Sequence, residues 1–366
     1  MKYYLIAGEA SGDLHGSNLI KALRQKDPTA DIRCWGGDKM QEAGGTIVKH
    51  IKALAFMGFI EVVRNLRTIL RNIKFCKEDI LAFRPDVIVF IDYPGFNMRI
   101  AKWAKQQGFR TVYYISPQLW AWKEGRVHQI KKYIDRMLVI FPFEKDFYKK
   151  WNYEVTYVGH PLVPVVDAFM AAHPELHPQS DVIALLPGSR KQEIKAKLPI
   201  MLEAAKKFST HRFFIGKAPT IDKELYDTYL QGYPNVTLVS ETYPLLMEAS
   251  AALVTSGTAT LETALFNVPE IVCYRAGRLS YEIGKRLIKL KFICIVNLIM
   301  NKEVVKELIQ DDLNIKNITA ELNTLLHNED KRKQIMTDYQ ELRRLLNYHG
   351  NASQNAAEAI IDFLAK

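Results

Sequence analysis

Short apolar runs of strand length alternate with helical patterns along the whole chain, and this alternation constrains the fold more than any other feature. The apolar runs fall at Tyr3–Ala7, Val87–Ile91, Thr111–Ile115 and Met137–Phe141, and then at Val182–Leu186, Arg212–Ile215, Thr237–Val239 and Ile271–Tyr274. Apolar strands separated by helices are typical of βαβ units, which build parallel sheets. The sequence therefore predicts an α/β protein in which two sets of such units follow one another.

The chain has 366 residues, too many for one ordinary hydrophobic core, so two domains are expected. The seam is predicted near Gly159-His160-Pro161, because a polar stretch from His173 to Asp181 follows it. We expect an N-terminal domain over residues 1–163 and a C-terminal domain over residues 164–340. Residues 341–366 are expected to form a C-terminal helix that packs back on the N-terminal domain.

The composition, with 48% hydrophobic and 25% charged residues, is typical of a globular protein. The first apolar stretch ends before Glu9, which is too short for a signal peptide, and no apolar run approaches the roughly 18 residues that cross a bilayer. The four cysteines have no metal-type spacing, and Cys273 and Cys294 lie in apolar surroundings typical of buried thiols. These features predict a reduced, cytoplasmic setting without a structural zinc.

A loop in the second half has the composition of a phosphate-binding turn. The strand Val182–Leu186 ends at Pro187-Gly188, and a helical pattern follows from Gln192. Ser189 and Arg190 are therefore expected at a helix N-terminus, where free N–H groups and the positive end of the helix dipole favour phosphate. The Arg190 guanidinium also suits phosphate oxygens. An ordinary strand-to-helix loop with a surface arginine would give the same pattern.

A second loop of this kind is Ser256-Gly257-Thr258, which follows a strand predicted at Ala252–Thr255. Small hydroxyl residues around a glycine let phosphate approach the backbone closely. Glu262 lies about one helical turn further on, where its carboxylate could accept hydrogen bonds from ribose hydroxyls. Alternatively, Ser256 and Thr258 are helix caps and Glu262 is a first-turn acid. Two phosphate-friendly loops in one half of the chain indicate a nucleotide.

The first half carries acids where its strands end. The loop over residues 8–13 is not a dinucleotide fingerprint, because its glycines lie four apart and Glu9 and Asp13 would repel a pyrophosphate. Its carboxylates are better suited to sugar hydroxyls. Asp92 follows the strand Val87–Ile91, at the end where ligands bind in open α/β sheets, so it is a candidate general base. Capping of the next turn is the alternative role.

The formal net charge of +10 indicates an anionic partner. No recognised nucleic-acid module is present, so a membrane surface is the favoured partner and nucleic acid is not expected. A turn with three large apolar residues precedes a basic helical stripe: the apolar residues are Phe56, Met57 and Phe59, and the stripe is Arg64, Arg67, Arg71 and Lys74. Such a helix can dock on an anionic leaflet or receive an acyl chain. The alternative is a helix that packs its aliphatic face, Val63, Leu66, Ile69, Leu70 and Ile73, on its own sheet.

Six motifs occur in a fixed order: Ala7–Asp13, Ser116-Pro117 with Trp120-Ala121-Trp122, Pro142–Lys145, Gly159-His160-Pro161, Leu185–Arg190 and Ser256–Glu262. In order and spacing they resemble the lipid-A-disaccharide synthase family, which comprises inverting glycosyltransferases of Gram-negative bacteria. The resemblance extends from the N-terminus to about Asp311. It implies a GT-B-type fold of two Rossmann-like domains with parallel sheets facing across a cleft, and a donor nucleotide held mainly by the C-terminal domain.

The resemblance implies transfer from UDP-2,3-diacylglucosamine to 2,3-diacylglucosamine 1-phosphate, which gives a β-1,6-linked disaccharide 1-phosphate and UDP. It implies that Asp92 is the base for the acceptor 6-hydroxyl and that Glu9 lines the acceptor side. The residues that it places around the donor are Ser189, Arg190, Ser256, Gly257, Thr258, Glu262, Asn297, Glu307 and Gln310, with Glu307 and Gln310 on the helix after Asn297. It implies no cofactor and no metal, and a cytoplasmic protein bound peripherally to the inner face of the inner membrane.

Two positions depart from the family pattern. Gly95 stands where members often carry an acid, and Val296 replaces a frequent proline before Asn297. Two other functions fit the same residues. A UDP-sugar 2-epimerase of this architecture would need no lipid, and a non-catalytic lipid- or nucleotide-binding protein would use Asp92 only structurally. The sequence leaves open the acyl-chain length and the oligomeric state, a homodimer included.

Overall fold

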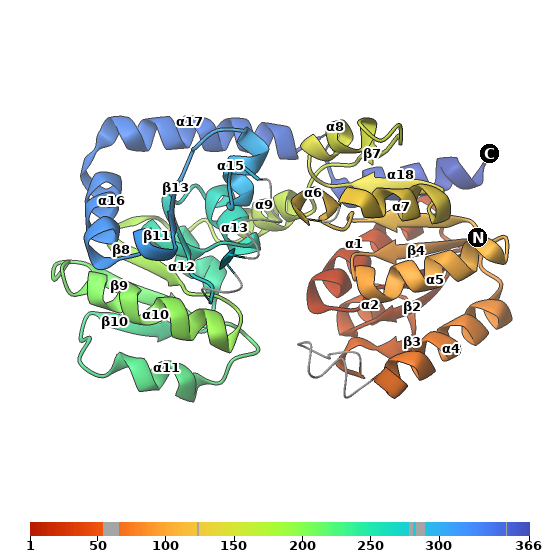
Figure 1. Ribbon diagram of the computed structural model, residues 1–366, viewed down its shortest axis with the longest axis horizontal. Helices are drawn as coiled ribbons and strands as arrows, with labels where there is room; N and C mark the ends of the chain where they lie inside the picture. Colours follow the sequence, from red (N-terminus) through yellow and green to blue (C-terminus); the bar gives the residue numbers. More distant parts are fainter. Residues whose placement is uncertain (54–65, 123, 278–280, 283–289, 349) are drawn as a thin grey trace. The chain divides into compact units, whose positions relative to one another are not determined.

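The computed structural model describes residues 1–53, 66–122, 124–277, 281–282, 290–348 and 350–366 (Figure 1). It divides into two compact units. Unit 1 comprises Met1–Pro161 and Leu346–Lys366, and unit 2 comprises Leu162–Leu345. The boundaries expected from the sequence lie after residues 163 and 340.

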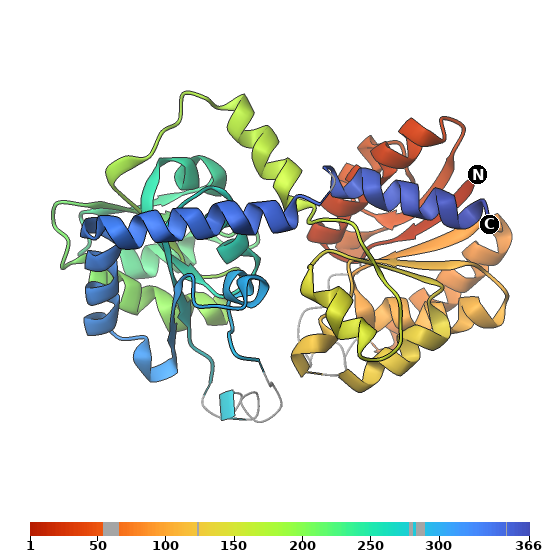
Figure 2. The same cartoon turned by 90° about the horizontal axis from the view of Figure 1, so that it is seen from above.

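Unit 1 is built on a seven-stranded sheet in the order β3-β2-β1-β4-β5-β6-β7, with every neighbouring pair parallel. The strands are β1 (Lys2–Ile6), β2 (Asp31–Gly36), β3 (Thr46–His50), β4 (Val87–Ile91), β5 (Thr111–Tyr114), β6 (Arg136–Val139) and β7 (Thr156–Tyr157). All five residues of β4 are buried, because helices lie on both faces of the sheet (Figure 2). This is why the strand reads as an unbroken apolar run.

The helices of unit 1 include the last helix of the chain. They are α1 (Ala10–Lys26), α2 (Asp38–Glu42), α4 (Leu66–Phe83), α5 (Pro94–Gln106), α6 (Leu119–Trp122), α7 (Val127–Tyr133), α8 (Phe143–Lys149) and α18 (Ala352–Leu364). Helix α18 packs against α1 and buries Ala352, Ala356 and Ile360 (Figures 1 and 2). The chain thus returns to the unit in which it began.

Unit 2 has a six-stranded parallel sheet in the order β10-β9-β8-β11-β12-β13. Its strands are β8 (Gln179–Leu186), β9 (Arg212–Gly216), β10 (Val236–Val239), β11 (Ala249–Thr255), β12 (Glu270–Tyr274) and β13 (Lys306–Ile309). Its helices are α9 (Leu162–Ala172), α10 (Lys191–Ala205), α11 (Lys223–Leu230), α12 (Thr242–Glu248), α13 (Thr258–Leu265), α15 (Ile295–Met300), α16 (Ile315–His327) and α17 (Glu329–Leu346). The predicted α/β class with two parallel sheets is confirmed.

Four strands are absent from the sequence-based prediction: β2, β3, β7 and β13. Three of them lie at sheet edges, and edge strands are only partly buried, so they lack a long apolar run. The placement of Glu307 and Gln310 differs from the one expected from the sequence. Glu307 lies on strand β13 and Gln310 begins a short 3-10 turn, Gln310–Asp312, whereas both were expected on a helix. A strand of four residues is too short for periodicity to separate it from a helix.

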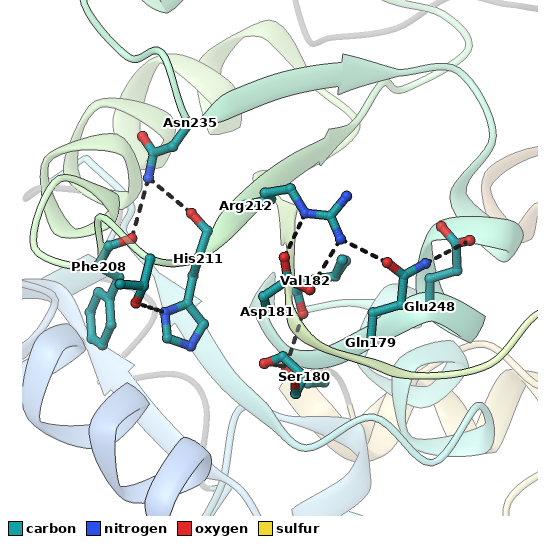
Figure 3. Close-up of polar contacts among 11 residues, drawn as sticks. Gln179, Ser180, Asp181, Val182, Phe208, His211, Arg212, Asn235 and Glu248 are labelled. Atoms are coloured by element: carbon teal, nitrogen blue, oxygen red, sulfur yellow. Dashed lines mark hydrogen bonds and ion pairs between the residues drawn. The ribbon is translucent and has the colours of Figure 1, made fainter.

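The amino ends of the strands in unit 2 are joined by polar side chains (Figure 3). Arg212 Nε donates to Asp181 Oδ2 over 2.6 Å, and its Nη2 donates to Gln179 Oε1 over 2.7 Å. The Gln179 amide in turn donates to Glu248 Oε1 over 3.1 Å. These polar groups bond one another, as expected for the edge of an open α/β sheet that does not bind ligands.

Candidate functional site

The carboxyl edge of the sheet in unit 1 carries the two acids proposed from the sequence. Glu9 begins α1 just after β1, and Asp92 follows β4 directly. Strands β1 and β4 are neighbours, with Ile6 opposite Phe90, so the two loops leave the sheet at the same edge. Glu9 is exposed and Asp92 is partly buried.

The Asp92 carboxyl group has a raised pKa. Burial raises it most, the Glu9 carboxylate adds to the effect, and a hydrogen bond to the Tyr93 backbone offsets part of it, giving a pKa of about 6. A carboxylate that titrates close to neutral pH is suited to accept a proton. A Cβ at Gly8 would lie 2.3 Å from the Tyr93 ring, so glycine is needed there for Tyr93 to pack against the loop that bears Glu9.

Asp13 has a structural role, which corrects its assignment to a hydroxyl-binding loop. Its side chain is buried, and Oδ1 accepts hydrogen bonds from the N–H groups of Gly37 (2.7 Å) and Met40 (3.1 Å), while Oδ2 accepts one from Lys39 (3.2 Å). It therefore caps the first turn of α2. Glu9 is the acid of this loop that faces solvent.

Sequence reasoning missed several polar groups near this edge. Asn97 and Tyr113 are fully buried, and both donate hydrogen bonds to the Asp92 carbonyl. Glu144 is buried, and it accepts hydrogen bonds from the N–H groups of Ile140 and Phe141, while burial raises its pKa to about 7. The burial of Asn97 and Glu144 was not readable, because a polar residue early in a helical pattern is normally a cap or a solvated side chain. Tyr113 lies on a predicted strand, and its contact with Asp92 joins residues distant in sequence.

The two phosphate-friendly loops lie together at the carboxyl edge of the sheet in unit 2. Strands β8 and β11 are neighbours, with Leu186 opposite Val254. The Thr255 hydroxyl donates to the Pro187 carbonyl over 2.9 Å and so ties one loop to the other. The structure therefore brings together residues that lie about 70 positions apart in the chain.

In the loop before α10, a carboxylate of the protein itself, that of Glu193, bonds the groups expected to bind phosphate. Ser189 and Arg190 are exposed, and Gly188 has a φ of +128°, a conformation that L side chains rarely adopt. The Glu193 carboxylate accepts the Ser189 N–H over 3.0 Å and lies 3.8 Å from the Arg190 guanidinium. A carboxylate thus occupies donors that the sequence predicts for phosphate, and a bound diphosphate would compete with it.

The loop before α13 is more open. Gly257 has a φ of +154°, and a Cβ there would meet nothing within 4 Å. Gly257 and Thr258 are exposed, and the N-cap residue of α13 is a glycine, which has no side chain to cap the first turn. Ser256 donates its hydroxyl hydrogen to the Ile293 carbonyl over 3.1 Å. The Thr260 N–H donates to the Gly257 carbonyl, so the anion-binding donors expected here are the exposed N–H groups that precede it, at Gly257 and Thr258.

Glu262 lies beneath the loop before α13. Burial raises its pKa, while a hydrogen bond from the Tyr243 hydroxyl to Oε1, 3.0 Å long, lowers it. The Tyr243 ring in turn packs on Phe266, with ring centroids 5.0 Å apart. This support fixes the Glu262 carboxylate, and within the described residues no hydrogen bond engages Oε2.

Asn297, Glu307 and Gln310 brace the backbone. The Asn297 amide donates to the Val305 carbonyl and to Glu307 Oε1, both over 2.9 Å, and its Oδ1 accepts two backbone N–H groups. Glu307 accepts the N–H groups of Ile293 (2.9 Å) and Cys294 (3.0 Å). Gln310 bonds both polar groups of the Ala276 backbone. Asn297 and Glu307 therefore fix the segment whose Ile293 carbonyl receives the Ser256 hydroxyl, and Gln310 fixes the backbone at Ala276.

The proposed membrane element is partly described. Phe56, Met57, Phe59 and Arg64 lie outside the described residues. On α4, Arg67, Arg71 and Lys74 are exposed, and Leu70 and Phe75 are exposed by 56% and 41%. The alternative interpretation placed Leu70 on a face that packs on the sheet, and for Leu70 this placement is wrong because its side chain is exposed. Leu70 lies one residue before Arg71, and solvated apolar and basic side chains are thus adjacent.

No helix in the described part of the chain combines the length and the apolar character needed to cross a bilayer. The described residues likewise include no cluster of three His, Cys, Asp or Glu side chains with metal-ligand geometry.

The architecture of two parallel α/β units recurs in several solved enzyme structures. The chain is similar to the solved UDP-GlcNAc 2-epimerase from Neisseria meningitidis, with a TM-score of 0.69 and 14% identity over 99% of this chain and 100% of that one. It is similar to the glycotransferase of kitacinnamycin, with a TM-score of 0.67 and 14% identity over 99% of each chain. At such low identity these likenesses show the fold, which is the GT-B type.

The family follows from the sequence comparisons. The model of the lipid-A-disaccharide synthetase family matches residues 3–361. Lipid-A-disaccharide synthase from Coxiella burnetii (strain CbuG_Q212) is 38% identical over 97% of this chain and 96% of its own length. The Syntrophus aciditrophicus enzyme is 39% identical, with the same shares covered. The chain belongs to the lipid-A-disaccharide synthase family and is a glycosyltransferase of lipid A synthesis.

Proposed function

We propose that the chain transfers 2,3-diacylglucosamine from UDP-2,3-diacylglucosamine to 2,3-diacylglucosamine 1-phosphate, with inversion, to give a β-1,6-linked disaccharide 1-phosphate and UDP. The membership of the family over nearly the whole chain supports the substrate class. The observation that carries the mechanism is the partly buried Asp92 carboxyl with a pKa of about 6 at the carboxyl end of β4, because inversion by single displacement needs one base for the acceptor hydroxyl.

In the proposed reaction Asp92 takes the proton of the acceptor 6-hydroxyl, and this oxygen forms a bond to C1 of the donor sugar. The bond from C1 to the diphosphate oxygen breaks, and its electron pair leaves with UDP. Glu9 contacts the acceptor beside Asp92. Burial raises the pKa of Asp92 most and the negative charge of Glu9 adds to the effect, which makes the carboxylate a more effective base.

The donor is proposed to bind at the carboxyl edge of unit 2. Arg190, Ser189 and the open first turn of α13 at Ser256–Thr258 would stabilise the negative charge of the leaving diphosphate. Glu262 would accept hydrogen bonds from the ribose hydroxyls through Oε2. Asn297, Glu307 and Gln310 would support this site through the backbone that they fix. The positive charge that balances the diphosphate of UDP then comes from Arg190 and the N-terminus of α13.

We also propose peripheral binding to the cytoplasmic face of the inner membrane, where the acylated substrates reside. Exposed Leu70 and Phe75 beside Arg67, Arg71 and Lys74 support this proposal, because a basic and apolar helix face is suited to an anionic leaflet.

One assay separates transfer from the alternatives. The protein is incubated with UDP-2,3-diacylglucosamine alone and then with the acceptor 2,3-diacylglucosamine 1-phosphate. UDP release that requires the acceptor is the expected result. An altered donor sugar without acceptor would instead identify an epimerase, and tight binding without turnover would identify a binding protein.

A further inference from the structure

Two consecutive non-glycine residues, Asp92 and Tyr93, have left-handed backbone conformations. Their φ angles are +45° and +50°. Side chains on L residues clash with the backbone in this region, so the surrounding contacts must hold the chain there. Backbone strain of this kind clusters at functional sites, where it orients a reactive group.

The contacts that hold this strand end converge on one carbonyl group. The Asp92 carbonyl accepts the Tyr113 hydroxyl over 2.6 Å and the Asn97 Nδ2 over 2.7 Å. Both side chains have no exposed surface. The Asp92 N–H donates to the Tyr114 carbonyl over 3.1 Å, so both polar groups of this backbone unit are engaged.

The orientation of the Asn97 amide is fixed by its surroundings. Besides the Asp92 carbonyl, Nδ2 lies 3.3 Å from the Ile6 carbonyl and 3.4 Å from the Ile91 carbonyl. A flipped amide would place Oδ1 among three carbonyl oxygens, which repel it. The observed amide leaves Oδ1 buried without a hydrogen bond from any described residue. An unmet buried acceptor is unfavourable, so the local arrangement is not the one that maximises stability.

We propose that Asn97 and Tyr113 are positioning residues of the transfer reaction, which clamp the Asp92 carbonyl and hold Asp92 in the left-handed conformation that presents its carboxylate to the acceptor. The inference rests on the proposed role of Asp92 as the base. Neither residue contacts substrate in this account. They act through the backbone of Asp92, which lies at the same carboxyl edge of the sheet as Glu9.

The test uses Tyr113→Phe, which removes one donor and keeps the ring, and Asn97→Leu, which removes the amide at similar volume. The acceptor-dependent release of UDP is measured against pH. We expect each variant to lower kcat about tenfold or more, because a slightly displaced base loses its alignment with the hydroxyl. The donor KM should not change. The acid limb of kcat/KM should move to lower pH, because Asp92 would relax toward solvent.

Tyr4→Phe is the matched control. It also removes a buried hydroxyl from this sheet, one that bonds Asp79 (2.7 Å) and Trp35 (2.9 Å). We expect it to lower thermal stability without moving the pH profile. A Tyr113→Phe variant with the same unmoved profile would have only a structural role, and the inference would be overturned.

Two further measurements separate this inference from the proposed function. In the Asp92→Asn background, Tyr113→Phe should cause no additional loss of kcat, since the base that it positions is gone. An equal loss in both backgrounds contradicts positioning, whereas near-normal turnover of Asp92→Asn itself contradicts the role of the base. A crystal structure of Tyr113→Phe should show a changed φ at Asp92. An unchanged φ overturns the clamp even if Asn97→Leu does not fold.

Discussion

The carboxyl edges of the two sheets share one architecture and have opposite chemistry. In unit 1 the edge carries the acids Glu9 and Asp92, and burial raises the pKa of Asp92 to about 6. In unit 2 the corresponding edge carries exposed helix starts and Arg190. A parallel sheet delivers loops to one edge, and the residues of those loops decide whether that edge is acidic or basic.

The largest effect should come from Asp92→Asn, which breaks the acidic side of the comparison. We expect turnover to fall at least about a hundredfold, because general base catalysis of this kind contributes roughly 10²–10⁴ in rate. The affinity for UDP should stay the same, since UDP is assigned to unit 2. Asp86→Asn, at the amino end of the same strand, is the control and should turn over normally. Similar rates for both variants would remove Asp92 from the mechanism.

Arg190→Ala tests the basic side. Its guanidinium is assigned to the diphosphate in the ground state and in the transition state, so both UDP affinity and turnover should decrease. A charge-assisted hydrogen bond contributes about 1.5–3 kcal/mol, which corresponds to roughly tenfold to a hundredfold weaker binding. Calorimetry with UDP measures the loss. Arg212→Ala, at the amino edge of the same sheet, is the control, and equal UDP affinity of the two variants would make the Arg190 loop a structural turn.

Glu9→Gln sharpens the comparison within unit 1. Asp92 acts as a base when deprotonated, so kcat/KM should fall as the pH drops through about 6. Removal of the Glu9 charge lowers the pKa of Asp92, and the acid limb should move to lower pH while activity at neutral pH changes by a few-fold. The pH profile of both proteins provides the measurement. An acid limb that stays in place would show that burial alone sets the pKa.

The smallest effects are expected for membrane binding. Each basic side chain near an anionic leaflet contributes about 1 kcal/mol, so Arg67→Glu, Arg71→Glu and Lys74→Glu should each weaken binding to anionic vesicles by about fivefold or more. High salt should weaken the electrostatic contribution to vesicle binding in the same way. The double substitution Phe56→Ser with Phe59→Ser should remove the apolar contribution. Co-sedimentation with anionic and neutral vesicles measures both parts. Lys102→Glu on α5 is the control, and an equal loss there would make the effect one of net charge alone.

The sequence predicted the interior strands other than β2 and the positions of both phosphate-friendly loops, because buried parallel strands are continuously apolar and glycine marks the turns that follow them. It did not predict β13, since a short edge strand such as Lys306–Ile309 has no distinctive period. It also did not reveal that Asp13 caps α2 or that Tyr113 bonds the Asp92 carbonyl. Such roles depend on contacts between residues distant in sequence, which local patterns do not encode.

Helix α18 gives the chain an order of maturation. Unit 1 lacks α18 until Leu346–Lys366 have left the ribosome, and all of unit 2 is synthesised before them. Until then the surface of α1 that α18 covers stays in water, and the nascent N-terminal unit is open to aggregation. Because α18 covers α1, the helix whose N-cap is Glu9, unit 1 is completed only after all of unit 2 has been synthesised, and a chain that stalls within unit 2 carries an incomplete first unit.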